Sequence, residues 1–547
     1  MNTSKVLKFV ILIALVSIRT ASAQEPHQHQ HDATEKLGQV NFPISCQPAT
    51  QQKFNRALAL LHSFQYVEAD QAFTEITASD PDCAMAWWGA AMSLYHPLWA
   101  PPTPAELQKG QEAVGRARTA NAKTQRERDY IAALDTFYKD ADKLDHWERA
   151  RAYAMSMEGV YRRYPQDREA AIFYALALNG TAPADGKNLA NRTKAAQILY
   201  HAWPHEPDHP GIAHYLIHSY DYPQLARLAL PAARRYARVA PSSPHALHMP
   251  SHIFTRLGMW PDSVQSNLAS ATAAKQEVDR VQPGAASKDQ LHAMDYLMYA
   301  YLQGAQDDQA KSILDEALAY SEADQAVFQA AFAWAAIPAR FVLERRRWKE
   351  AASLTLHPAK FPWEHFRFAE ANIYFARAVG AARNGETAAA RQEVHKLASI
   401  QTALSEAKTG YDWAKQVQIQ HQAAAAWLAQ AEGKTGEAVA LLRAAAELED
   451  STDKHPVTPG AILPAREMLG DLLLELKRPA EGLKEYEAVL RTAPNRFNSL
   501  YGAAQAAELA GNRQKARAYY KKLTTICSHA TGRKSELRLA KVYLAKK

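Results

Sequence analysis

The sequence predicts an all-α solenoid of stacked helical hairpins with a concave groove. Between residues 50 and 110, apolar residues recur with a helical period that short turns interrupt, and nothing there alternates as a half-buried strand would. A pattern about 34 residues long returns along the chain, as in helical repeat proteins. The chain of 547 residues is also far longer than one ordinary core, which favours a repeat array or several domains.

Small residues, an aromatic residue and a closing proline define the repeat. A frame that starts at Thr50 puts Ala57 at position eight, Ala69 at twenty, Phe73 at twenty-four and Pro81 at thirty-two. A tetratricopeptide repeat carries small residues at the positions where its two helices touch, and a proline where its second helix ends. The pattern therefore predicts tetratricopeptide-like hairpins in this part of the chain.

The same frame returns further along the chain. Units start at Pro210, Pro244 and Leu291, and a late copy contains Ala504 and Ala516. We therefore expect one continuous solenoid over residues 46–547, with its clearest units at 50–110, 210–325 and 463–530.

The N-terminus predicts export. Lys5 and Lys8 precede an apolar stretch, and small residues at Ala21 and Ala23 follow it, which is the pattern of a signal peptide over residues 1–23. A flexible, histidine-containing tail is expected over 24–45, and its HQHQH stretch is suited to capturing metal only loosely. No later run reaches the roughly 20 apolar residues of a membrane helix. We expect a periplasmic or secreted protein.

Charge and cysteine content restrict the function classes. The 64 basic and 57 acidic residues are mixed along the chain, so the net charge of +7 does not predict a nucleic-acid partner. Three cysteines are too few for a disulfide scaffold or a cysteine-based zinc site. In an oxidising compartment Cys46 and Cys83 are candidates for a disulfide, although spacing alone leaves the pairing open, and Cys527 would stay free.

Several blocks carry a resemblance beyond the generic repeat. The stretches HPGIAHYLIHSYDYP, HALHMPSHIFTRLGMW, LHAMDYLMYAYLQ and HPVTPGAILPARE, with HSFQYVEADQAFTEITASDPDCAMAWWGAAMSLYHPLW near the N-terminus, resemble a group of exported bacterial tetratricopeptide repeat proteins. The resemblance covers nearly all of the chain after the signal peptide. It implies the solenoid fold and does not imply an activity.

The repeat family also implies which residues face the groove. In such proteins, positions two, five, nine, twelve and thirteen of the first helix point into it. In the three central units, these positions hold His214, His218, Asp221, Tyr222, His245, His248, His252, Arg256, His292, Asp295 and Tyr299.

The groove histidines predict a transition-metal site. Pairs of histidines one helical turn apart, on helices that pack about 8–10 Å from one another, can deliver several nitrogen ligands to one ion. The predicted ligands are His214, His218, His245, His248, His252, His292 and Asp295. Asp221, Tyr222, Arg256 and Tyr299 are expected to contact a bound ligand. Donors of this kind suit copper or zinc best, with iron and nickel also possible.

Other interpretations stay open at this stage. The histidines can instead form a metal-free polar or catalytic pocket, or belong to ordinary packing. His62, His96 and Trp88 form a second candidate ligand patch, for which packing at the groove edge is the alternative. No phosphate loop, serine elbow or zinc-protease motif occurs, so the sequence does not decide whether the protein is an enzyme. A small molecule or peptide in the groove is the expected partner, either of a metal-free scaffold or of a metal-dependent enzyme.

Overall fold

The computed structural model describes residues 35–98, 101–120, 122–183, 188–406, 411–532 and 534–546. The predicted signal peptide and the histidines of the HQHQH stretch lie outside the described residues. Within the described ranges the only β-structure consists of isolated bridges, between Ala286 and Ala323 and between Gln306 and Thr531. The prediction of an all-α fold is confirmed.

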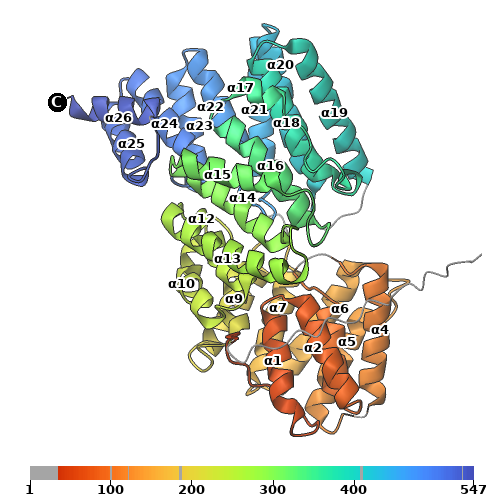
Figure 1. The fold of residues 1–547 in the computed structure, drawn as a ribbon. Coiled ribbons are helices and arrows are strands. Elements are labelled where there is room, and N and C mark those ends of the chain that lie inside the picture. Colours follow the sequence, from red (N-terminus) through yellow and green to blue (C-terminus); the bar gives the residue numbers. More distant parts are fainter. Residues whose placement is uncertain are drawn as a thin grey trace, which may run out of the picture. The chain divides into compact units, whose positions relative to one another are not determined.

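The first half of the chain forms helices that follow one another closely (Figure 1). They are α1 (Thr50–His62), α2 (Tyr66–Ser79), α3 (Ala84–Ser93), α4 (Pro104–Thr119), α5 (Gln125–Tyr138), α6 (His146–Arg163), α7 (Arg168–Gly180), α8 (Ala190–Ala202), α9 (Pro210–Tyr220), the short 3-10 helix η1 (Ala226–Ala229), α10 (Leu230–Val239), α11 (Pro244–His248), α12 (Pro250–Arg256) and α13 (Trp260–Val281).

The second half continues in the same way. Its helices are α14 (Lys288–Gln303), α15 (Asp307–Ala319), α16 (Phe328–Glu344), α17 (Trp348–Ala352), the 3-10 helix η2 (Trp363–His365), α18 (Arg367–Arg383), α19 (Thr387–Glu406), α20 (Trp413–Ala431), α21 (Thr435–Asp450), α22 (Ala465–Glu475), α23 (Pro479–Thr492), α24 (Phe497–Leu509), α25 (Arg513–Ile526) and α26 (Ser535–Ala545).

The order of packing is that of a solenoid. Most successive helices pack on one another, as α1 on α2 and α20 on α21 do, and each such pair is a helical hairpin. Helices two or more places apart also pack in series, α14 on α16, α16 on α18 and α18 on α20. Each hairpin therefore buries its apolar face mainly against its neighbours, and the predicted tetratricopeptide-like solenoid is present. No helix in the described ranges is long and apolar enough to span a membrane.

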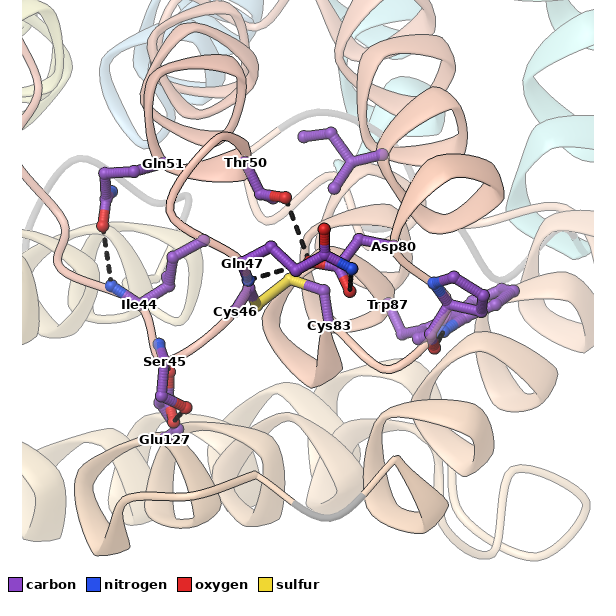
Figure 2. Close-up of a disulfide and its surroundings, with 12 residues drawn as sticks. Ile44, Ser45, Cys46, Gln47, Thr50, Gln51, Asp80, Cys83, Trp87 and Glu127 are labelled. Atoms are coloured by element: carbon purple, nitrogen blue, oxygen red, sulfur yellow. Dashed lines mark hydrogen bonds between the residues drawn. A yellow bond between two sulfur atoms is a disulfide. The ribbon is translucent and has the colours of Figure 1, made fainter.

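A disulfide joins the segment before α1 to the start of α3. Figure 2 shows Cys46 bonded to Cys83, the pairing that the sequence left open. Asp80 lies beside this link, where its carboxylate accepts hydrogen bonds from the Gln47 backbone N–H and the Thr50 hydroxyl, both at 3.0 Å. The third cysteine, Cys527, is free and buried.

The segment before the disulfide differs from the expected flexible tail. Residues 36–45 belong to the compact unit, which begins at Lys36. The Gln39 N–H donates to the Asp208 carbonyl at 3.0 Å, and the fully buried Phe42 stacks on Trp88 with ring centroids 5.8 Å apart. The boundary predicted at residue 45 is therefore wrong, because Phe42 anchors this segment in the core.

Two large apolar clusters make up most of the core. One runs from Leu37 to Phe254 and the other from Ala286 to Leu473. The last helices of the first cluster and the first helix of the second also carry a group of buried histidines. Most of the buried histidines thus lie on α9, α11, α12 and α14.

Candidate metal centres

Short proline-initiated helices position the central histidines. Helix α9 begins at Pro210 and places His214 and His218 one turn apart on the same face. Pro250 lacks an N–H, which separates α11 from α12. Met249 between them nevertheless keeps helical angles, with φ −52° and ψ −36°. The helical path therefore continues through the proline, so that the histidines of α11 and α12 stay on one face.

Three histidines form what we call the first triad: His214, His218 and His245. The Nε2 atom of His214 lies 3.1 Å from Nε2 of His218 and 3.1 Å from Nε2 of His245. The triad is buried, with at most 9% of any of the three residues exposed. Phe64 and Tyr236 pack against the His214 ring, with ring centroids 4.2 and 5.2 Å away. Three ring nitrogens therefore converge in an aromatic enclosure.

A second triad consists of His248, His252 and His292. The Nε2 atoms of His248 and His252 lie 2.9 Å apart, and the ring of His292 lies 4.2 Å from that of His248, measured between centroids. All three residues are buried, and one ring nitrogen from each lies within 4.8 Å of the others. Tyr296 packs edge-on against the His248 ring.

The two triads have the same register in the repeat. Each takes its first two histidines from positions five and nine of one unit and its third from position two of the next unit. Position two of each following unit therefore completes the triad of the unit before it. At positions five and nine of the unit that starts at Leu291, Asp295 and Tyr299 replace the histidines.

Proton positions in the second triad follow from its hydrogen bonds. His252 Nδ1 lies 3.0 Å from the Asp221 carboxylate, which can only accept a hydrogen bond. His248 Nδ1 lies 2.6 Å from Asn267 Oδ1, and Nδ2 of that amide donates to the Ser263 carbonyl at 2.7 Å, which fixes the orientation of the amide. Both Nδ1 atoms must carry hydrogen. In the neutral rings, both Nε2 atoms are therefore bare lone pairs that face one another at 2.9 Å.

The first triad has a similar arrangement. His214 Nδ1 donates to the backbone carbonyl of His62 at 2.7 Å, which leaves a lone pair on Nε2. That single lone pair has two ring nitrogens at 3.1 Å, from His218 and His245. Two N–H donors cannot both be well aligned on it. Around a tetrahedral ion bound at about 2.0–2.1 Å, nitrogen ligands lie about 3.3 Å apart, close to the observed spacing.

Protonation of the imidazoles does not place a positive charge between these lone pairs. Burial lowers the pKa of His214 to about 3 and lowers the pKa values of His218, His245 and His248 well below the usual range. Burial likewise lowers the pKa of His252, although Asp221 opposes that effect. The imidazoles are neutral near pH 7, so a metal cation is the group that fits between their lone pairs.

Charged groups surround Asp221 behind the second triad. Its carboxylate accepts from Arg256 Nε at 2.9 Å and from Lys454 Nζ at 3.3 Å, and Arg256 also binds the Asp453 carboxylate through two nitrogens. Burial alone would raise the pKa of Asp221, but Lys454 and Arg256 together bring that pKa well below its usual range. Burial lowers the pKa of Lys454 to about 8. Asp221 therefore stays ionised and orients His252.

A third cluster, formed by His62, Glu169 and His209, differs from the triads in where its protons lie. Glu169 accepts from Nε2 of His62 at 3.1 Å and from Nε2 of His209 at 2.9 Å, and the Tyr215 hydroxyl donates to Nδ1 of His62 at 2.9 Å. Each proton on these three contacts has an acceptor. The carboxylate therefore pairs with both histidines without a metal, although the buried His209 Nδ1 has no hydrogen-bond partner among the described residues and the atoms lie close enough together to be ligands.

The remaining predicted site residues lie outside both triads. Asp295 pairs with Arg340 at 2.8 Å, and the Tyr299 hydroxyl accepts from Arg496 at 3.1 Å. Trp88 and His62 are fully buried in the N-terminal part of the solenoid. The half-buried His96 packs against Tyr66, with ring centroids 4.6 Å apart.

A cavity of about 450 Å³ lies beside the charged groups. Its lining includes Tyr222, Arg256, Tyr299, Trp413 and Lys454, and it contains no triad histidine. The irregular segment 451–464, between α21 and α22, forms part of its wall.

The segment 451–464 contacts α14 and α16 through its backbone. The Tyr296 hydroxyl lies 3.2 Å from the carbonyl oxygens of both Pro456 and Thr458. Arg340 donates to the carbonyls of Gly460 and Ala461. These contacts bring Lys454 to Asp221. Sequence reasoning missed Lys454 and Asn267, because neither lies at a groove position of the repeat frame.

No family model and no curated protein matches the chain. Solved structures similar to it include the human IFIT1 dimer with m7Gppp-AAAA, at 11% identity and TM-score 0.37, covering 81% of this chain and 90% of that one. The APC/C hetero-tetramer Cut9–Hcn1 is similar at 11% identity and TM-score 0.34, covering 91% and 83%. Naa15/Naa10 bound to HypK-THB is similar at 13% identity and TM-score 0.24, covering 90% and 71%. The packing of its own helices defines the chain as a tetratricopeptide-like α-solenoid with buried histidine clusters.

Proposed function

We propose that this protein is a transition-metal-binding solenoid that holds one ion at each triad. The observation that carries the proposal is the 2.9 Å contact between Nε2 of His248 and Nε2 of His252, whose Nδ1 atoms both donate hydrogen bonds. Two lone pairs repel one another at this distance unless a cation lies between them. The sequence led us to expect one centre, whereas the grouping of the histidines favours two.

The donor set favours copper or zinc. Each triad offers three imidazole nitrogens, and imidazole suits zinc, copper, iron and nickel. Asn267, Asp221 and the His62 carbonyl hold the ring nitrogens that face away from the ion, which is the usual support for metal-bound histidine. Iron and nickel stay possible occupants.

We also propose that the protein works outside the cytoplasm, in the periplasm or as a secreted protein. The predicted signal peptide motivates this proposal. The Cys46–Cys83 disulfide supports it, because disulfides persist mainly in oxidising compartments.

A metal-dependent reaction on a small molecule is the second candidate function. The cavity of about 450 Å³ is the size of a small-ligand site, and two of its lining residues, Arg256 and Lys454, contact the carboxylate that orients His252. A molecule bound there would act on the second triad through Asp221. A metal-free peptide-binding scaffold is the alternative that the following experiment tests.

The test is the metal content of the full chain and of matched variants. The protein is loaded with Cu or Zn, separated from free metal by gel filtration and analysed for metal and protein. We expect two ions per chain, one after His218→Ala or His292→Ala, and none after both changes. The exposed His205→Ala and His395→Ala are matched controls that should retain two ions.

The histidine-containing tail and loss of folding are the two confounding effects. The variants are therefore made in a background with His27, His29 and His31 changed to alanine, and helical circular dichroism confirms that each one folds. Metal should also raise the melting temperature of the protein in which both triads are intact, because a ligand that binds only the folded state stabilises that state. Equal metal content in the double variant and its parent, or no metal in either, would favour the scaffold.

A further inference from the structure

We propose that the second triad selects copper in its monovalent state, Cu(I), over divalent ions. This inference rests on the proposed function, since it concerns the charge of the ion that the triad binds. The charges, contacts and number of donors around His248, His252 and His292 favour this ion.

The donor set of the second triad brings no negative charge. Its three imidazoles are neutral, and in the described part of the chain no carboxylate or thiolate joins the group of donor atoms. Only 2%, 4% and 3% of His248, His292 and His252 are exposed, so the ion loses most of its contact with water. The cost of removing an ion from water grows with the square of its charge, so it is about four times larger for a divalent ion.

The nearest carboxylate is already compensated. Asp221 contacts Arg256 at 2.9 Å and Lys454 at 3.3 Å, and Asp453 binds the other side of Arg256 at 2.8 Å. Two acidic and two basic side chains therefore balance one another behind His252. None of them is left to offset the second positive charge of a divalent ion.

Lys454 adds a field that opposes positive charge in the triad. Its ammonium nitrogen lies 3.3 Å from the same Asp221 oxygen that accepts from His252 Nδ1 at 3.0 Å, so a positive charge lies close behind a ring of the triad. The repulsion between Lys454 and a bound ion is twice as large for a divalent as for a monovalent charge. The surroundings of the triad therefore favour the lower charge.

The number of donors points in the same direction. Zinc in proteins is almost always four-coordinate, with a water in the fourth position of a catalytic site. The second triad offers three nitrogens from the described residues. Cu(I) is stable with three ligands, so the triad can satisfy it without a water, whereas zinc would need a fourth ligand.

The test uses the full-length His218→Ala variant in the background with His27, His29 and His31 changed to alanine, which leaves the second triad as the only intact one. Under anaerobic conditions, Cu(I) is titrated against the chromogenic chelator bicinchoninate, and Zn(II) against a fluorescent zinc indicator. We expect one Cu(I) per chain. For each ion, the affinity of the site is divided by the affinity of the same ion for three imidazoles in water. This ratio should be at least about 100-fold larger for Cu(I) than for Zn(II). Adding His292→Ala should abolish the Cu(I) site.

Lys454→Met tests the electrostatic cause without touching a ligand. Removal of this charge should raise both affinities, and the fold-increase for Zn(II) should be about ten times the fold-increase for Cu(I). Lys349→Met, at an exposed lysine, is the matched control and should change neither affinity.

The Cu(I) and Zn(II) titrations separate the choice of ion, its electrostatic cause and the metal centre itself. Zn(II) binding that depends on His292 and shows no preference for Cu(I) would overturn the selection of the monovalent ion and leave the metal centre standing. An equal response of both ions to Lys454→Met would overturn the electrostatic cause. If neither ion binds to the folded variant, the proposed function itself fails.

Discussion

Asp221 lies directly behind His252, with its carboxylate 3.0 Å from Nδ1 of the imidazole. The same carboxylate also holds Arg256 and Lys454. One acidic side chain from the end of α9 thus connects the second triad to the segment 451–464 and to the cavity beside it.

Asp221→Asn should weaken metal binding at the second triad by about 10–100-fold, the usual effect of losing the partner of a metal-bound histidine. The amide keeps the shape of the side chain, but it loses the charge that compensates Lys454 and Arg256. Competition titration of His218→Ala with and without the change measures the effect. Asp208→Asn, at a carboxylate that pairs with Arg235 on the surface, should leave the affinity unchanged. An unchanged affinity in Asp221→Asn would show that Asp221 does not support metal binding at the second triad.

Asn267→Leu should also reduce the affinity of the second triad, by about tenfold or more. The change removes the oxygen that accepts from His248 Nδ1, so the ring loses the contact that fixes its tautomer and orientation. Metal analysis of this variant should show a weakened second ion and an intact first one. Loss of both ions to the same extent would indicate a general folding defect, which thermal unfolding would reveal.

Glu169→Gln should leave the metal content unchanged and lower the free energy of unfolding by about 1–3 kcal/mol. In the third cluster, the carboxylate accepts hydrogen bonds from two buried histidines, and an amide can accept only one of them well. Urea unfolding and metal analysis of the same sample separate the two effects. Loss of an ion from this variant would mean that the third cluster is a metal site.

The effect of Glu169 should depend on pH. Burial alone would raise the pKa of this carboxyl, but His209 and His62 outweigh burial and bring the pKa well below its usual range. A lowered pKa in the folded state contributes stability that is present above the unfolded value of about 4.3 and is lost as the pH falls below it. The difference in unfolding free energy between the parent and Glu169→Gln should therefore be constant from pH 7 to about pH 5 and shrink at lower pH. A difference that stays constant down to pH 3 would contradict the assignment.

Loss of the disulfide should destabilise the N-terminal hairpins without affecting the triads. Cys46 and Cys83 are 37 residues apart, and a loop of that length corresponds to about 4 kcal/mol of chain entropy. The Cys46→Ser, Cys83→Ser double variant should unfold at lower urea concentration and keep both metal ions. Unchanged urea unfolding would show that other contacts, such as those of Phe42, hold this segment.

The repeat frame made the fold and most of the triad residues predictable. Positions two, five and nine, which the resemblance to the repeat family places in the groove, identify all six triad histidines. The frame did not show that position two joins the preceding unit, since that depends on how neighbouring hairpins pack. Asp295 occupies a frame position as well, yet it pairs with Arg340 on the next long helix.

The supporting residues were beyond sequence reasoning. Lys454 meets Asp221 across 233 residues, through an irregular segment with no periodicity. Asn267 lies on the long helix α13, where a single amide gives no sign of which ring it faces. Phe42 lies before the first repeat, so the frame could not place it in the core.

A crystal structure of the metal-loaded protein, with anomalous data collected at the absorption edge of the metal, locates the bound ions. We expect two anomalous peaks. One lies about 2 Å from the Nε2 atoms of His214, His218 and His245, and the other is equally close to the Nε2 atoms of His248 and His252 and to a ring nitrogen of His292. Peaks confined to surface histidines or to the cluster around Glu169, or triads without metal in a protein that has bound it, would show that the triads are not the metal centres.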